Sequence, residues 1–113
     1  MSDHYHDPND KAYGRQLRQG APEGFEALMA FDNAALRSES KVIPAKYNEL
    51  IALGVALTTQ CVYCIEAHTK AAKQAGATQA EVAEAVLTAA ALRAGGAVAH
   101  GFLAMKFFEK DGE

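Results

Sequence analysis

The sequence predicts an all-α fold, and three observations carry this prediction. Alanine accounts for 24 of the 113 residues, against three prolines and no tryptophan, and alanine is the strongest helix former and is depleted in strands. In several segments the apolar residues recur at the i, i+3, i+4, i+7 spacing of an amphipathic helix. Recognisable helix start and stop signals separate those segments.

The size and charge of the chain exclude several classes of protein. A chain of 113 residues and 12.0 kDa corresponds to one small domain. Its net charge of −3 and pI near 5.8 argue against a nucleic-acid partner. The polar N-terminus is unlike a signal or transit peptide, and Thr88, Arg93 and His100 interrupt the longest apolar stretch, Ala85–Ala104. We therefore expect a cytoplasmic protein with no membrane partner.

Residues 1–20 are expected to form an N-terminal arm, and residues 21–113 a single all-helical domain. The arm contains Pro8, Gly14 and Gly20 and shows no clear period, although a short helix is expected over Asp10–Arg18. Alanine-rich helices approach closely but bury little area each. We therefore expect other copies of the chain to complete part of the core.

Two helices are predicted in the first half of the domain. Proline suits the first helical position, so a helix is expected from Pro22 to about Arg37. A second helix is expected to start near Pro44 and to end before a polar interruption at residues 58–60. One apolar face of this helix is predicted from residues at helical spacing, namely Tyr47, Leu50, Ile51, Gly54 and Leu57 or Thr58.

The second half contains a third helix, expected from about Cys61 to Gly76, a residue suited to the left-handed position after a helix end. A fourth helix is expected to open at residues 78–81, which have the Thr-x-x-Glu form of a capping box, and to run to about Arg93. The Gly95-Gly96 pair either ends this helix or lets two backbones approach closely. A fifth helical segment is expected over residues 97–109.

Both cysteines of the chain fall together, in the sequence Cys61-Val62-Tyr63-Cys64, and His68 follows four residues later. On a helix, positions 61, 64 and 68 lie within an arc of about 60°, so the three side chains share one face. Unpaired N–H groups in the first helical turn favour a thiolate. This spacing therefore predicts a dithiol that closes reversibly into a disulfide.

Glu49 is predicted to be the fourth member of this site. If the second and third helices form an antiparallel hairpin that turns near residues 59–60, Glu49 lies about 15 Å back from the turn and His68 about 12 Å beyond it. The carboxylate and the imidazole are then nearly level. A carboxylate beside an imidazole fixes its tautomer and raises its basicity, so the histidine can take a thiol proton.

The alternatives to a reactive dithiol are purely structural roles for these residues and a metal site. The cysteines and His68 could be core residues, and Glu49 could be a solvated charge. Cys61, Cys64 and His68, with Glu49 or His100 as a fourth ligand, also offer the ligand atoms that zinc favours. Structural zinc sites usually bring a second ligand pair from elsewhere in the chain, and the one further pair in this sequence, His4 and His6, lies in the polar N-terminal arm, where it is expected to be inert.

The pattern Glu49, eleven residues, Cys61-x-x-Cys64, three residues, His68 resembles the signature of alkylhydroperoxidase D-like proteins of the carboxymuconolactone decarboxylase superfamily. The surrounding sequence extends the resemblance to roughly residues 22–108, including Pro44 and the Ala-Gly-Gly-Ala segment at 94–97. The resemblance implies an alkylhydroperoxidase D-like helical bundle in which an antiparallel hairpin carries the Cys-x-x-Cys site. It also implies homo-oligomers, often trimers or hexamers.

The implied activity is that of an antioxidant peroxidase that reduces hydrogen peroxide or organic hydroperoxides without a cofactor or a metal. The family places the attacking thiol at Cys64, the resolving thiol at Cys61 and the proton relay at Glu49 and His68, with a dithiol of the dihydrolipoamide type as reductant. The positions of the two cysteines in the helix favour the opposite assignment, because Cys61 is nearer the helix N-terminus, where a thiolate is stabilised. Some members carry histidine just before the second cysteine, where this chain has Tyr63. A thiol–disulfide oxidoreductase or redox sensor without peroxidase turnover is the alternative.

Overall fold

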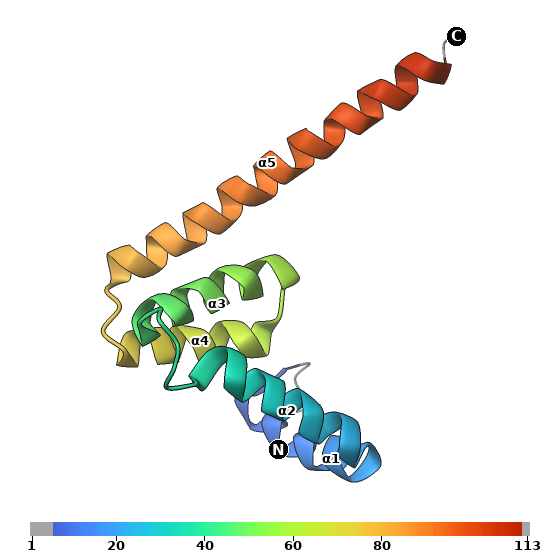
Figure 1. Ribbon diagram of the computed structural model, residues 1–113. Helices are drawn as coiled ribbons and strands as arrows, with labels where there is room; N and C mark the ends of the chain where they lie inside the picture. Colours follow the sequence, from blue (N-terminus) through green and yellow to red (C-terminus); the bar gives the residue numbers. More distant parts are fainter. Residues whose placement is uncertain (1–5, 112–113) are drawn as a thin grey trace.

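The computed structural model describes residues 6–111, and every regular element in this range is a helix (Figure 1). The prediction of an all-α protein is therefore confirmed for the described residues. In chain order the elements are the 3₁₀ helix η1 (Pro8–Tyr13) and the α-helices α1 (Gly14–Gly20), α2 (Pro22–Arg37), α3 (Ala45–Thr59), α4 (Val62–Gln74) and α5 (Gln79–Asp111).

The N-terminal arm is helical over most of its described length. Asp7 caps η1, since its side chain accepts from the backbone N–H of Asn9 at 2.8 Å and its own N–H donates to Asp10 at 2.9 Å. The single short helix expected here is thus longer and divided into η1 and α1, which leads directly into α2. Residues 1–5 of the predicted arm lie outside the described range, and α2 has the bounds that the sequence predicts.

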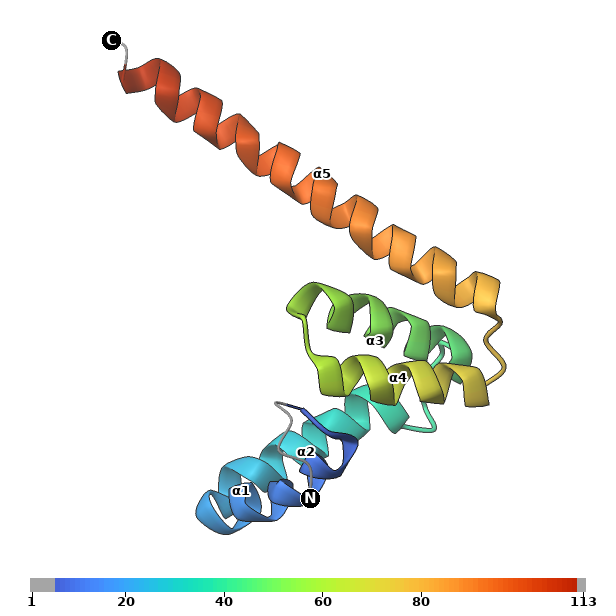
Figure 2. The ribbon, with the colours of Figure 1, turned by 180° about the vertical axis from the view of Figure 1, so that it is seen from behind.

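Helices α3 and α4 form the antiparallel hairpin that the site requires. They lie side by side in both views (Figures 1 and 2). Gln60 makes the turn between them in the left-handed conformation, with φ 59° and ψ 40°. Of the hydrophobic side chains described, those that are fully buried lie in this hairpin: Leu53, Ala56 and Ala72.

The predicted apolar stripe of α3 lies on the side of the helix that packs on α5, where Leu50 and Gly54 are half-buried, and the opposite side packs on α4. The buried residues of α3 are Asn48, Leu53 and Ala56, whereas Tyr47 and Ile51 of the predicted stripe are about half exposed. Because α3 is apolar on most of its sides, its periodicity does not select one face. The side with the small residues allows α4 to approach most closely, and this rotation turns Glu49 toward α4.

The start of the last helix is as predicted, but its length is not. The Thr78 backbone N–H donates to Glu81 at 2.9 Å, and the Glu81 N–H donates to Thr78 Oγ1 at 3.1 Å, which completes the capping box. Helix α5 then continues through Gly95-Gly96 to Asp111, so the expectation of a break there is wrong. The pair costs about 2 kcal/mol relative to alanine, which the long helical run on both sides offsets.

The C-terminal half of α5 stands clear of the rest of the chain (Figures 1 and 2). Its first half packs on α3, and Arg93 donates to the Thr58 carbonyl at 2.6 Å rather than pairing with an acidic side chain. The radius of gyration is 18.8 Å, whereas a compact domain of this length has about 13 Å. The large apolar side chains exposed beyond Arg93 are Val98, Phe102, Leu103, Met105, Phe107 and Phe108.

Within the described range, α5 is also the one helix long and apolar enough to cross a membrane. Over Gln79–Lys110 its mean hydropathy reaches 1.4. Length and composition alone support this statement. The helix carries Arg93 near its centre, and a charge at that depth costs about 3 kcal/mol.

Candidate active site

The two cysteines meet at the N-terminus of α4, and both are reduced. Cys61 is the N-cap residue, and its sulfur accepts from the backbone N–H of Cys64 at 3.3 Å. The two sulfurs are also hydrogen-bonded to each other, with 2.7 Å between the two Sγ atoms. The sulfurs therefore need to move by less than about 1 Å to form a disulfide.

This hydrogen bond separates the acidities of the two thiols. The pKa of Cys61 is lowered, first by the Cys64 thiol that donates to its sulfur and then by the backbone N–H groups of Cys64 and Tyr63. The pKa of Cys64 is raised to about 11, first because its proton is held by Cys61 and then because the thiol is partly buried. Cys61 therefore carries the thiolate first, as its place at the helix start predicts.

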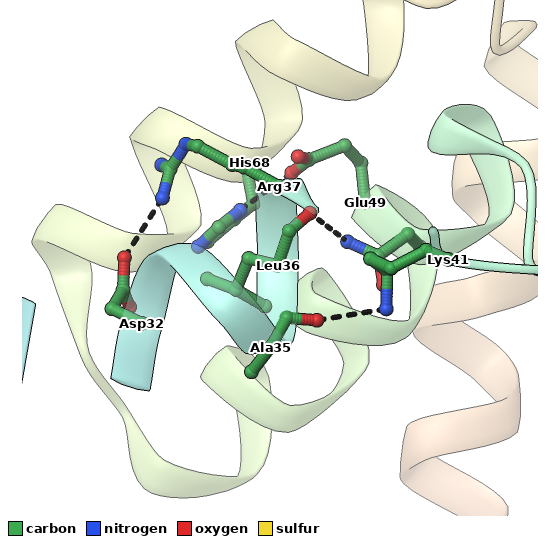
Figure 3. Close-up of polar contacts among 8 residues, drawn as sticks. Asp32, Ala35, Leu36, Arg37, Lys41, Glu49 and His68 are labelled. Carbon is green, nitrogen blue, oxygen red and sulfur yellow. Dashed lines mark hydrogen bonds and ion pairs between the residues drawn. The ribbon is translucent and has the colours of Figure 1, made fainter. Parts of the chain in front are cut away.

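Glu49 of α3 and His68 of α4 form the second part of the site (Figure 3). His68 Nδ1 lies 2.6 Å from Glu49 Oε2, and both side chains are only 18% exposed. The hairpin thus brings the two residues to the same level, as its length predicts. A carboxylate on Nδ1 fixes the tautomer and the orientation of the imidazole ring. The geometry is confirmed, and the catalytic role remains a prediction.

Cys64 and His68 open into one cavity of about 300 Å³ between α2, α3 and α4. The cavity walls are mainly apolar, and the Cys64 thiol and the His68 imidazole are among the few polar groups that line them. Besides Asn48, Cys64 and His68, the lining residues are Leu36, Ile51, Ala52, Val55, Ala56 and Thr59.

The N-terminal arm contacts α4 at Tyr63, the residue before Cys64. The Tyr63 hydroxyl donates to Asp10 Oδ2 at 2.8 Å, and the ring of His6 meets the Tyr63 ring edge-on at 6.4 Å. The positive charge of Lys11 lowers the pKa of Cys64, while the negative charge of Asp32 raises it, both more weakly than the Cys61 contact. Tyr63, which replaces a family histidine, thus anchors the arm.

Sequence analysis missed three polar residues near the dithiol: Asp10, Lys11 and Asn48. Asp10 lies 53 residues from its partner Tyr63, and no local spacing signals such a contact. Asn48 could have been found, because residues 48, 52, 56 and 59 form a second stripe of small and polar residues at helical spacing on α3.

Within residues 6–111 no three His, Cys, Asp or Glu side chains converge in a way that would hold a metal ion. Glu49, one proposed fourth ligand, is bonded to His68 instead. His100, the other, is exposed on α5. The zinc alternative therefore has no support in the described geometry.

Fold and site together define a small all-helical dithiol protein in which a histidine–carboxylate pair adjoins the sulfurs. Residues 22–107 match the model of the carboxymuconolactone decarboxylase family, and the chain belongs to this family. This confirms the resemblance drawn from the Glu49–His68 motif. The family includes both decarboxylases and peroxidases.

Two proteins are similar in sequence to this chain, one over most of its length and the other over about half of it. "Uncharacterized protein 4 in cox locus" of Paracoccus denitrificans is 39% identical over 103 residues, which cover 88% of this chain and 86% of that protein. An "Uncharacterized protein" of Haemophilus influenzae is 44% identical over 62 residues, which cover 55% and 52% of the two chains. Neither name states an activity, so the function has to be argued from the site.

Proposed function

We propose that the protein is a thiol-dependent peroxidase that reduces hydrogen peroxide or organic hydroperoxides through a reversible disulfide between Cys61 and Cys64. The proposal is carried by the cavity that Cys64 and His68 share, together with the Glu49 carboxylate, which lies 2.6 Å from the His68 imidazole. The Cys64 thiol holds its proton strongly, with a pKa of about 11. An adjacent base is therefore needed for Cys64 to react near neutral pH.

In the first half of the reaction, His68 takes the Cys64 proton, directly or through a water, and Glu49 stabilises the resulting imidazolium. The Cys64 thiolate attacks the terminal oxygen of the hydroperoxide, so that an S–O bond forms and the O–O bond breaks. His68 returns the proton to the departing alkoxide, which leaves as an alcohol, or as water from hydrogen peroxide. The sulfur loses two electrons and becomes a sulfenic acid.

In the second half, the Cys61 thiolate attacks the sulfenic sulfur, the disulfide forms and hydroxide leaves as water after taking a proton. The low pKa of Cys61 suits this role. A dithiol of the dihydrolipoamide type then reduces the disulfide by thiol exchange and becomes oxidised itself. The cycle uses no metal or cofactor, and we propose that it operates in the cytoplasm, where reduced dithiols persist.

Peroxide consumption in the presence of dithiothreitol tests the proposal. The wild-type protein should consume hydrogen peroxide catalytically, and Cys64→Ser should reduce the rate to that of the buffer with reductant. Cys61→Ser should allow one oxidation that dimedone traps at Cys64 as the sulfenic acid. Equal rates for wild type and Cys64→Ser would contradict the proposal.

A thiol–disulfide oxidoreductase or redox sensor without peroxidase turnover is the second candidate. It is favoured by Tyr63, whose hydroxyl is used to hold Asp10 at 2.8 Å, where some family members have an imidazole. Such a protein would lose two hydrogens on mild oxidation and would exchange disulfides with a dithiol. It would nevertheless leave the hydrogen peroxide concentration unchanged beyond one equivalent.

We also propose that the protein works as a homo-oligomer, a trimer or a hexamer, in which further copies cover α5. Few hydrophobic side chains of the described residues are buried within one chain, which is too small a core for a stable domain. Gly95, Gly96 and Gly101 have open space where a Cβ would stand, so another helix can approach their backbone closely. Arg93 favours a protein partner over a bilayer, because it would be buried without a countercharge in lipid.

Light scattering coupled to size-exclusion chromatography tests this assembly. Without detergent, the purified protein should elute as one species with a mass three or six times 12.0 kDa. A monomer that is soluble only in detergent would instead show that lipid covers α5, and a stable monomer in plain buffer would equally contradict the proposal.

A further inference from the structure

The cavity beside Cys64 and His68 holds another polar side chain, that of Asn48, to which the steps above give no role. Asn48 lies on α3 and is only 8% exposed. It lines the same cavity as Cys64 and His68. A buried amide is costly unless its polar atoms find hydrogen-bond partners, so the position of each of its atoms matters.

The two ends of the Asn48 amide face different surroundings. Its Nδ2 donates to the backbone carbonyl of Leu36 at the end of α2, at 3.3 Å. This contact turns Oδ1 away from α2, and no described residue donates a hydrogen bond to it. Among the described residues no fully buried side-chain oxygen lacks a partner. Oδ1 therefore keeps accessible surface, and the space that Asn48 lines is the cavity.

We propose that Asn48 binds the hydroperoxide group itself, with Oδ1 accepting a hydrogen bond from the peroxide O–H. The inference rests on the peroxidase function proposed above and adds the residue that orients its substrate. The other walls are mainly apolar, and the Thr59 hydroxyl already donates to the Ala56 carbonyl at 3.3 Å. The amide oxygen is thus an acceptor with no other partner on the cavity wall.

The proposed contact fixes the oxygen atom that reacts. The terminal oxygen carries the hydrogen that Asn48 binds, and the same oxygen forms the S–O bond with Cys64 as the O–O bond breaks. The amide neither gains nor loses a proton, so the atoms and electrons balance as in the steps above. Because every hydroperoxide has this O–H group, Asn48 should serve hydrogen peroxide and organic hydroperoxides alike.

A purely structural role for Asn48 makes a different prediction, and the chain offers a matched control for it. Two side chains cap carbonyls in the last turn of α2. Asn48 donates to the Leu36 carbonyl, and Lys41 donates to the Ala35 carbonyl at 2.7 Å (Figure 3). Lys41 does not line the cavity. If capping were the only role of Asn48, the loss of either cap would affect the site to a similar extent.

The experiment measures the second-order rate constant for oxidation of the reduced full-length protein by excess hydroperoxide, followed by mass spectrometry as the loss of two hydrogens. Wild type, Asn48→Leu and Lys41→Met are compared with hydrogen peroxide and with tert-butyl hydroperoxide. We expect Asn48→Leu to be slower by about tenfold with both hydroperoxides. Lys41→Met should stay within about twofold of wild type. Alkylation of the thiols by iodoacetamide, which has no O–H group, should be unchanged in Asn48→Leu.

Each result bears on one proposal. Wild type that is not oxidised would overturn the peroxidase function. Oxidation of Asn48→Leu at the wild-type rate, or an equal loss in Lys41→Met, would overturn the role of Asn48 while leaving the peroxidase function intact. A parallel loss of alkylation in Asn48→Leu would show a disturbed dithiol and would also overturn it. If circular dichroism shows that Asn48→Leu does not fold, Asn48→Ser, whose shorter hydroxyl cannot reach the same point, takes its place.

Discussion

The α3–α4 hairpin and the C-terminal half of α5 both consist of largely apolar helix, but they differ in where their side chains find contacts. In the hairpin, the side chains of the candidate site contact partners within the same chain. Glu49 pairs with His68, and Cys61 pairs with Cys64. In α5 beyond Arg93, large apolar side chains such as Phe102, which is 69% exposed, are left mostly uncovered by the described residues.

This difference separates the chemistry of the protein from its stability. The site lies inside one hairpin, so a single chain already assembles every group that the proposed reaction uses. The long helix buries little apolar surface within the chain, so its stability has to come from outside. Mutations in the hairpin should therefore lower the reaction rate, whereas mutations in α5 should weaken assembly or stability. The largest expected effects come first.

The largest effect is expected from a charge in the uncovered half of α5. Phe102→Asp should abolish the oligomer, because an unpaired charge buried at an interface costs about 3–5 kcal/mol for each copy. Light scattering should then report a monomer or an aggregate. Val42→Asp is the control, since Val42 is 94% exposed in the loop before α3 and should leave the assembly unchanged. A Phe102→Asp protein that elutes like wild type would show that this face is not an interface.

The second prediction concerns the hairpin and should affect rate without affecting assembly. Glu49→Gln keeps the shape and a hydrogen bond to His68 but removes the charge that stabilises the imidazolium. Peroxide consumption should fall by about 100-fold, with the oligomer mass unchanged. Glu66→Gln removes a carboxylate of α4 whose one partner among residues 6–111 is Lys70, at 3.0 Å, and should be neutral. If the two variants lose activity equally, the carboxylate at Glu49 has no special role.

The hairpin was also the part of the molecule most accessible to sequence reasoning. Its turn near Gln60, the level of Glu49 with His68 and the helix start at Cys61 all follow from spacing and from the rise of a helix. Each depends on residues less than 20 positions apart. Interactions of this kind are local, so they leave a pattern in the sequence.

Three features could not be predicted from the sequence, each for a physical reason. The side of α3 that packs on α4 could not be predicted, because α3 is apolar almost all round and only the fit to α4 decides which face α4 covers. The straight passage of α5 through Gly95-Gly96 depends on the summed helix propensity of both flanks rather than on the pair itself. The contact of Asp10 with Tyr63 joins residues far apart in the chain and leaves no periodic signal.

The third prediction separates the two thiols by their pH dependence. Since the pKa of Cys61 is lowered and that of Cys64 is raised to about 11, alkylation between pH 7 and 9 should label Cys61 first. In Cys61→Ser the thiolate that holds the Cys64 proton is gone, so the pKa of Cys64 should fall back toward its usual range. Peptide mapping after brief iodoacetamide treatment measures both effects. Preferential labelling of Cys64 in wild type would contradict the assigned order.

The smallest effect is expected where the two regions join, at the capping box of α5. Thr78→Ala should cost about 1 kcal/mol of unfolding free energy, because the N–H of Glu81 loses its acceptor at 3.1 Å. The pKa of Glu81 is lowered, first by the Thr78 N–H and then by Lys46. The contribution of Glu81 is therefore complete at neutral pH and is lost as the pH falls through that lowered pKa, so melting is measured at pH 7.

The control for the cap is another threonine of the same helix. The Thr88 hydroxyl donates to the Glu84 carbonyl at 2.8 Å, a contact that does not stabilise the middle of a helix. Thr88→Ala should therefore melt at or slightly above the wild-type temperature, because alanine is the better helix former. Both variants are melted at one protein concentration, since assembly makes the melting temperature depend on concentration. An equal loss in the two threonine variants would mean that a threonine hydroxyl stabilises α5 wherever it stands, and that the cap has no special effect.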